Sequence, residues 1–101
     1  MRIISRKKLK TFWDAHAGAK QALRAWFHEA KIAKWKSFQD IKAMYAAADV
    51  RPDNRVIFDI KGNTYRLIVK IHYNTGIVFI RFVGTHAQYD RIDPDTIREK
   101  P

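Results

Sequence analysis

The chain has 101 residues, of which 47% are hydrophobic and 13% aromatic, which suits one packed domain and argues against disorder. Twenty Lys and Arg residues oppose ten Asp and Glu residues, and the net charge of +10 predicts an acidic partner: RNA, DNA, the ribosome or an acidic protein. The lack of cysteine excludes disulfides and thiolate metal sites. No apolar run has the length of a membrane span, so we expect a cytoplasmic protein without membrane contacts.

The N-terminal third predicts a short strand followed by two helices. Residues 2–4 suit an edge strand, and Ser5 after them suits a helix N-cap. Apolar residues then recur at helical spacing in two stretches, which Ala17 and Gly18 separate. The two stripes contain Leu9, Phe12 and Trp13, and then Ala22, Leu23, Trp26, Phe27 and Ala30. We therefore expect a helical hairpin, with Lys7, Lys8 and Lys10 on the outer surface of its first helix.

The middle of the chain predicts a third, shorter helix and then a loop. Trp35 lies between two lysines in a basic and aromatic connector. Ser37 and Asp40 have the spacing of a capping box, and the helix would continue through Ile41, Met44 and Tyr45. Residues 50–54 contain Pro and Asx residues, which predict a loop that leads into a sheet.

Residues 55–60, 64–73 and 76–83 predict a three-stranded antiparallel meander, with turns centred on Gly62-Asn63 and Asn74-Thr75. In the register that these turns impose, one side of the sheet carries only apolar pairs: Ile60–Tyr65, Phe58–Leu67, Val56–Val69, Leu67–Phe82, Val69–Ile80 and Ile71–Val78. That side predicts the core. The other side mixes cations with aliphatic residues, and we expect it to lie open or half open.

Arg81 is the most informative residue of that second face, because it interrupts an otherwise apolar strand. The predicted register places it opposite Ile68 and diagonal to Arg66 and Lys70, so that three cations converge. Such a cluster suits a phosphate. The alternative for Arg66 is an ion pair with Asp59 directly across the first hairpin; for the three cations together we favour anion binding.

Gly84 and Thr85 predict the end of the third strand and the cap of one helical turn over residues 86–91. His86 can exchange a proton near neutral pH, and Tyr89 and Asp90 lie on the same side of such a turn. The alternative is structural: Tyr89 packs its ring and Asp90 balances a cation. His16, His28 and His72 lack convergent carboxylates, so we predict no metal site and no cofactor. The polar tail of residues 93–101 is expected to be flexible.

Three segments carry a resemblance to a known family: NRVIFDIKGNTYRLIV, VFIRFV and GTHAQYD, all between Asn54 and Asp90. They resemble the HigB toxins of bacterial toxin–antitoxin modules, a branch of the RelE-like superfamily that ends in a TH-x-x-YD segment. The resemblance implies one compact α+β domain over residues 1–101, with an N-terminal helical hairpin packed on a small antiparallel sheet. It also implies an mRNA interferase that cuts mRNA, typically on the ribosome, and a cognate HigA-like antitoxin of helix-turn-helix type.

The resemblance also assigns roles to individual residues. Arg66 and Arg81 match the strand arginines of the family and would hold the scissile phosphate, while His86 and Tyr89 match its terminal motif and would transfer protons. Asp90 would support His86. From charge and register we add a set of RNA contacts: Lys70, Arg55, Lys61, Lys7, Lys8 and Lys10. Without a metal, cleavage would proceed by attack of the 2′-hydroxyl on the adjacent phosphorus.

Two other functions fit the same sequence. A non-catalytic RNA- or ribosome-binding module would need only cations and a stacking surface, which Trp35 would supply. An inactive relative of the toxins would keep only its antitoxin contacts.

Overall fold

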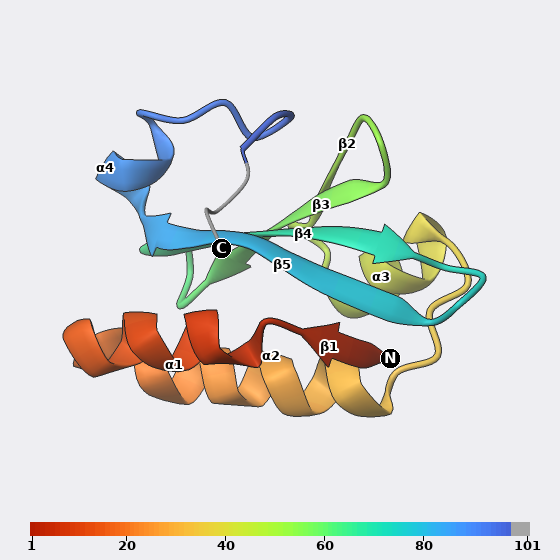
Figure 1. Ribbon diagram of the computed structural model, residues 1–101, viewed down its shortest axis with the longest axis horizontal. Coiled ribbons are helices and arrows are strands. Elements are labelled where there is room, and N and C mark those ends of the chain that lie inside the picture. The colour runs from red at the N-terminus through yellow and green to blue at the C-terminus, as the bar shows by residue number, and fades with distance from the viewer. Residues whose placement is uncertain (98–101) are drawn as a thin grey trace.

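A computed structural model describes residues 1–97 of the chain (Figure 1). Five strands form one sheet in the order β1-β5-β4-β3-β2. Helices α1 and α2 lie beneath this sheet in Figure 1, whereas α4 and the C-terminal segment lie above it. The elements are β1 (Arg2–Ile4), α1 (Arg6–Ala15), a 3-10 turn (Ala17–Ala19), α2 (Lys20–Ile32), α3 (Phe38–Met44), β2 (Asp49–Arg51), β3 (Arg55–Ile60), β4 (Tyr65–His72), β5 (Ile77–Thr85) and α4 (His86–Tyr89).

The core lies between the helical hairpin and one face of the sheet, so the expected α+β class is confirmed. The predicted apolar stripes are its helical half: α1 buries Leu9, Phe12 and Trp13, and α2 buries Leu23, Trp26 and Ala30. The strands contribute the residues that the alternation assigned to this face, among them Val56, Phe58, Leu67, Val69, Ile71, Val78 and Ile80. Burial of two stripes against one apolar sheet face accounts for the arrangement.

The N-terminal strand exists, but it differs from the prediction in two respects. β1 pairs with β5 in parallel, so the sheet is mixed rather than wholly antiparallel. Ser5 adopts a left-handed backbone with φ 74° and its side chain makes no capping hydrogen bond. An N-cap residue usually has extended backbone, and Ser5, the single residue between β1 and α1, lies outside that region.

Two further features of the middle segment correct the sequence interpretation. The predicted capping box is absent: the Ser37 side chain makes no cap bond, and the Asp40 carboxylate accepts from the Lys36 backbone N–H at 2.8 Å. Residues 49–51, part of which we read as loop, form the edge strand β2. The Pro and Asx residues beside it concealed a strand of only three residues.

Trp35 is a core residue. Its side chain is 3% exposed, its ring stacks on Phe58 with centroids 6.1 Å apart, and its Nε1 donates to the Met44 sulfur at 3.2 Å. It therefore offers no stacking surface to RNA, contrary to the expectation for a binding module.

The register of the first hairpin is confirmed, with Phe58 opposite Leu67 and Ile60 opposite Tyr65. The second hairpin follows the prediction only from its turn to the pair Val69–Ile80, where a β-bulge begins. Beyond the bulge Ile68 pairs with Phe82 and Leu67 with Val83. The predicted pair Leu67–Phe82 is wrong, because Arg81 is an extra residue on β5.

The bulge changes which side chains of β5 face the core. Val83, which the alternation assigned to the second face, lies opposite Leu67 and belongs to the core. Arg81 contacts the ring of Phe79 with its guanidinium carbon 5.3 Å from the centroid, which places it on the second face. Bulges re-aim side chains and are frequent beside active sites.

The second face is less open than expected. Ile57 and Ile68 are 3% and 0% exposed, and Arg55 is also buried. Arg55 donates to the carbonyls of Pro94 and Ile97, so the tail contacts the sheet as far as Ile97. The expected flexibility of residues 93–101 stays a prediction, and residues 98–101 lie outside the described part of the chain.

Within residues 1–97, no helix combines the length and the apolar character that crossing a bilayer requires.

Trp35→Ala is expected to lower the free energy of unfolding by about 3–5 kcal/mol, because it opens a cavity beside Phe58. Urea unfolding followed by circular dichroism measures the change. Trp35→Phe keeps an aromatic ring in place and serves as the milder control. Both variants should bind RNA as the wild type does under conditions in which they are folded; loss of RNA affinity in folded Trp35→Phe would contradict a purely structural role.

Candidate active site

The candidate site forms where β4 and β5 meet α4. Thr85 begins α4 with a capping box: its side chain accepts from the Gln88 backbone N–H at 3.2 Å, and the Gln88 side chain accepts from the Thr85 N–H at 2.8 Å. The predicted cap is thus confirmed. Tyr65 of β4 pairs with Thr85, and the His86 N–H donates to the Thr64 carbonyl at 3.2 Å. These bonds attach the first residue of α4 to the turn between β3 and β4.

Gly84 is required at this junction because there is no room for a side chain. A Cβ at this position would lie 2.5 Å from the Phe82 ring and 2.9 Å from the Gln88 side-chain oxygen. Both neighbours depend on features already described: the bulge brings Phe82 to this face, and the capping box fixes Gln88. The glycine of the GTHAQYD segment therefore permits α4 to dock closely on β5.

Arg66 contacts both the neighbouring strand β3 and the helix α4. Its Nη1 forms an ion pair with Asp59, the residue opposite it on β3, and both side chains are about one-fifth exposed (22% and 23%). The guanidinium carbon also lies 5.3 Å from the centroid of the Tyr89 ring. The ion pair that we considered as the alternative is therefore present, and it holds the cation against one of the predicted catalytic residues.

His86 and Asp90 form a second pair on α4. The Nδ1 atom of His86 lies 3.3 Å from an Asp90 carboxylate oxygen, and the imidazole is about half exposed (48%). Its ring centroid lies 6.5 Å from that of Tyr89. The structure thus brings together four predicted residues, Arg66, His86, Tyr89 and Asp90, with the imidazole open to an incoming ligand.

The three strand cations do not form the compact cluster that we expected. Arg81 is the bulged residue and no longer faces Ile68. Lys70 lies four residues from Arg66 along β4, a separation of about 13 Å at the usual rise of a strand. Its amino group is 2.8 Å from the Asp53 carboxylate. The cations are instead distributed along β4 and β5, with Arg66 beside α4 and Lys70 near the far end of β4.

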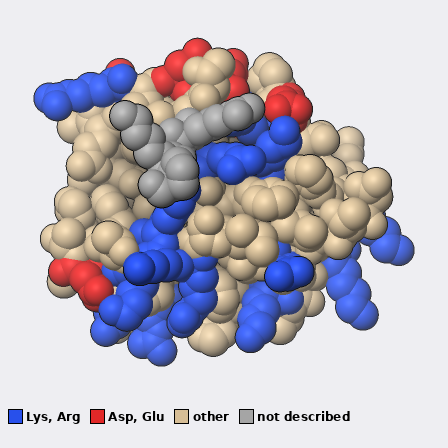
Figure 2. Space-filling model, viewed as in Figure 1, with Lys and Arg blue, Asp and Glu red and all other residues tan. Residues whose placement is uncertain are grey.

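The remaining predicted RNA contacts divide into surface lysines and one buried arginine. Figure 2 shows Lys and Arg side chains gathered over α1 and α2 along the lower part of the view. Lys7 is exposed in α1, and Lys10 forms an exposed ion pair with Asp14 at 2.9 Å. Arg55, by contrast, is 3% exposed, so it does not present its charge at the surface.

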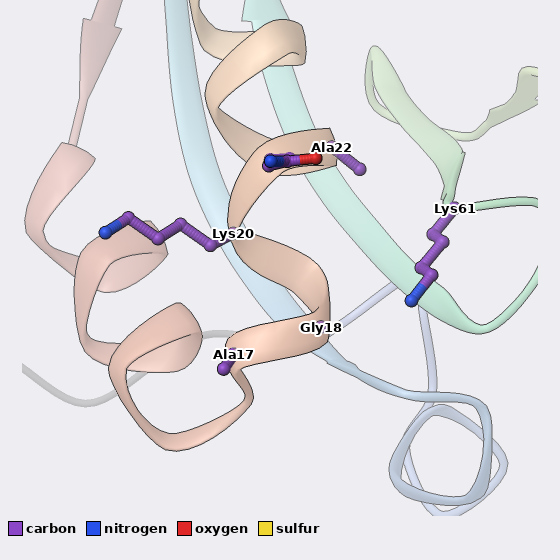
Figure 3. Close-up of a pocket in the computed structure, with 6 residues that line it drawn as sticks. Ala17, Gly18, Lys20, Ala22 and Lys61 are labelled. Atoms are coloured by element: carbon purple, nitrogen blue, oxygen red, sulfur yellow. The ribbon is translucent and has the colours of Figure 1, made fainter.

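Lys61 borders a pocket between the start of α2 and the turn that joins β3 to β4 (Figure 3). This pocket has a volume of about 480 Å³, and Lys20 also borders it. In Figure 3 the Lys61 side chain extends toward Gly18, whereas Lys20 points away from it. Lys61 lies in the same turn as Thr64, whose carbonyl accepts from the His86 N–H. This turn therefore connects the pocket to the candidate site.

Among the described residues, no group of three His, Asp or Glu side chains is placed to hold a metal ion. The chemistry that these side chains can supply is proton transfer at His86 and Tyr89 and stabilisation of negative charge at Arg66. Cleavage of a phosphodiester is one reaction that uses both.

Sequence reasoning missed three features that build the site: the bulge at Arg81, the close contact of Gly84 with Phe82, and the bonds from β2 and β3 to residues 94–97. Two of them had a signal in the sequence. A cation within an apolar strand is compatible with a bulge, and a glycine directly after a strand indicates a close approach.

Comparison with known proteins agrees with the resemblance. The protein-family model for the HigB toxin, described as the RelE-like toxic component of a toxin–antitoxin system, matches residues 19–92. The chain belongs to the HigB toxin family. Its curated relatives include the mRNA interferase toxin HigB of Escherichia coli K12 and the mRNA interferase HigB of Shigella flexneri. Each is 26% identical over 92 residues, which cover 89% of this chain and 88% of the relative.

The family match begins inside the 3-10 turn and ends just after α4, so it includes the candidate site but not α1. Lys7, Lys8 and Lys10 therefore lie outside the matched segment.

Gly84→Ala is expected to lower the free energy of unfolding by about 1–3 kcal/mol, because a methyl group there overlaps the Phe82 ring. In a Phe82→Leu background the same substitution should cost less, since leucine lacks the far end of the ring. A double-mutant cycle by urea unfolding measures this coupling. Equal costs in both backgrounds would show that the Phe82 contact does not explain the glycine.

Proposed function

We propose that this chain is an mRNA interferase: the endoribonuclease toxin of a type II toxin–antitoxin system, which cuts mRNA on the ribosome and so inhibits translation and growth. The single observation that carries the proposal is the placement of α4, which holds His86 and Tyr89 beside a strand arginine whose cation lies over the Tyr89 ring. Membership of the HigB family and the printed names of the relatives support it.

The proposed reaction is metal-independent attack of a ribose 2′-hydroxyl on the adjacent phosphorus. Arg66 and Arg81 stabilise the charge that builds on the phosphoryl oxygens, and His86 transfers a proton. Asp90, 3.3 Å from His86 Nδ1, orients the imidazole. Tyr89 either orients the nucleotide or acts as a second proton-transfer group.

Asp59 orients Arg66 for the proposed reaction. Its ion pair keeps Arg66 in one orientation before RNA binds, and the Tyr89 ring contacts the same guanidinium. A phosphate that approaches Arg66 can use its remaining N–H donors, because a guanidinium has five. Pre-orientation of this kind lowers the reorganisation that the transition state requires.

RNA binding is proposed for lysines of α1 and of the β3–β4 turn rather than for the buried Arg55. Lys7, Lys8 and Lys10 of α1 and Lys61 at the pocket supply charge for the RNA backbone or for the ribosome. Lys70 can contribute only if phosphate competes with Asp53 for its amino group. Because mRNA and ribosomes are the proposed targets, we place the protein in the cytoplasm.

The proposed partner is a cognate antitoxin, HigA-like and of helix-turn-helix type. A chain of net charge +10 attracts an acidic protein segment as well as RNA, and such attraction accelerates association at low salt.

The rival function, a binding module without chemistry, loses its stacking surface because Trp35 is buried in the core. An inactive toxin relative would retain the fold without cleaving RNA, and a cleavage assay distinguishes it from the proposal.

Production of the chain alone in bacteria is expected to arrest growth and shorten messages, and His86→Ala should abolish both effects because the proton-transfer group is lost. RNA affinity of His86→Ala should stay within about twofold of wild type, since an exposed imidazole contributes little binding charge. His28→Ala, an exposed histidine of α2, is the matched control and should behave as wild type. A wild-type chain that accumulates folded and harmless would refute the enzymatic proposal.

Substitution of the strand arginines should affect the cleavage rate, whereas substitution of the helix lysines should affect RNA binding. Arg66→Ala and Arg81→Ala are expected to slow single-turnover cleavage of bound RNA by about a hundredfold or more, because their contribution is largest in the transition state. Joint replacement of Lys7, Lys8 and Lys10 with Ala should instead weaken binding and lower the salt slope by about one unit per lost phosphate contact.

Single-turnover rates at saturating enzyme separate the two groups. Wild-type cleavage rates for bound Arg66→Ala and Arg81→Ala would show that the proposed phosphate site is wrong.

A further inference from the structure

The segment after α4 is held by β2 and β3, which lie at the opposite edge of the sheet from β1. Arg51 donates from Nε and Nη2 to the two carboxylate oxygens of Asp95, at 2.7 and 2.8 Å. Arg55, its cross-strand neighbour, donates from Nη1 to the carbonyls of Pro94 and Ile97, at 3.1 and 2.8 Å. We call the side chains of Arg51, Arg55 and Asp95 the arginine clamp.

The segment from residue 91 to residue 97 contains no helix or strand. Its local hydrogen bonds run from the Thr96 and Ile97 N–H groups to the Asp93 carbonyl, at 3.2 and 2.9 Å, and from the Asp95 N–H to the Asp93 carboxylate at 2.9 Å. In Figure 1 the segment leaves α4 and crosses above the sheet toward β3. Among the described residues, Arg51 and Arg55 donate tertiary hydrogen bonds to it.

The chemistry of the clamp favours orientation over stability. Arg55 is a charged residue that is 3% exposed, and an apolar side chain of similar size is usually as stable at a buried position, or more so. Arg51 and Arg55 also lie directly opposite each other, a costly arrangement for like charges. What two guanidinium groups provide is a fixed set of directed hydrogen bonds.

The chain itself joins the clamp to the candidate site. Asp95, through its hydrogen bond and its charge, raises the pKa of Arg51. Pro94, whose carbonyl accepts from Arg55, follows Tyr89 by only five residues, and the Tyr89 ring contacts Arg66. The position of the clamped segment and the position of Tyr89 are thus linked through a short stretch of chain.

α4 is a single turn of four residues, and so short a helix has no stability of its own. The N-terminal end of α4 is fixed by the Thr85–Gln88 capping box and by the hydrogen bond from the His86 N–H to the Thr64 carbonyl. The chain beyond its C-terminal end is fixed by the clamp, whose first contact, at Pro94, lies five residues after Tyr89. Release of either end should allow α4 to move.

We propose that Arg51, Arg55 and Asp95 are positioning residues, which hold α4 in the orientation that keeps Tyr89 against Arg66. They do not touch the reacting atoms. The inference rests on the proposed function, since the consequence of this positioning is the rate of RNA cleavage.

Asp95→Asn tests the clamp, because the amide keeps the shape of the side chain and removes the charge that binds Arg51. Glu29→Gln is the matched control: it neutralises a carboxylate that accepts from the Tyr45 hydroxyl at 2.5 Å, far along the sequence from α4. Asp95→Glu restores the charge and should recover part of the wild-type behaviour.

Three measurements decide the result: amide hydrogen exchange over residues 86–91, single-turnover cleavage of bound RNA, and RNA affinity. We expect Asp95→Asn to accelerate exchange selectively in residues 86–91 and to slow cleavage by about ten- to hundredfold, as small misplacements of catalytic groups do. RNA affinity should stay within about twofold, and Glu29→Gln should change none of the three.

Unchanged exchange over residues 86–91, or faster exchange with an unchanged cleavage rate, would overturn the inference. An equal increase of exchange in all strands would also overturn it, because it would indicate general destabilisation. If the wild type does not cut RNA at all, the proposed function fails, while hydrogen exchange still decides whether the clamp holds α4.

Discussion

The candidate site depends on one cation, Arg66, which lies between a carboxylate on the neighbouring strand and an aromatic ring on α4. The ion pair with Asp59 offsets the cost of a partly buried guanidinium, and it also removes part of the charge that a phosphate would meet. These opposite effects are compatible, because a guanidinium has donors in several directions and one carboxylate does not use them all. The ion pair can therefore hold Arg66 in place before substrate arrives.

The rest of the site follows from the need to bury one face of the sheet. α1 and α2 cover the apolar face, so the polar groups of β4 and β5 must lie on the other face. There the bulge at Arg81 shifts the alternation of β5, brings Phe82 over Gly84 and returns Val83 to the core. The close docking of α4 depends on this shift, and the clamp from β2 and β3 fixes the chain that follows.

Much of this could be read from the sequence because alternation in strands and spacing in helices are local signals. The stripes of α1 and α2 and the first hairpin follow from them. The Thr85 cap followed from residue type, and the family from the resemblance of the motifs between Asn54 and Asp90. The bulge was missed because an extra residue leaves the apolar pattern of β5 nearly unchanged while it shifts every later pair. Arg55 was read as an RNA contact because its partners, two backbone carbonyls of the tail, have no side-chain signal. Ser5 and Ser37 have the right residue type for a cap, but the backbone and neighbouring groups decide whether the bond forms.

We propose that this arrangement cuts RNA by attack of a 2′-hydroxyl on the adjacent phosphorus. The most direct measurement uses a message that carries a single 2′-deoxynucleotide at its mapped cleavage position, tested both free and on programmed ribosomes. This substitution is expected to abolish cleavage at that bond, because the attacking hydroxyl is missing, while the all-ribose message yields a 2′,3′-cyclic phosphate or 3′-phosphate end and a 5′-hydroxyl end. Cleavage of the deoxy-substituted bond, or products with 3′-hydroxyl ends, would contradict it.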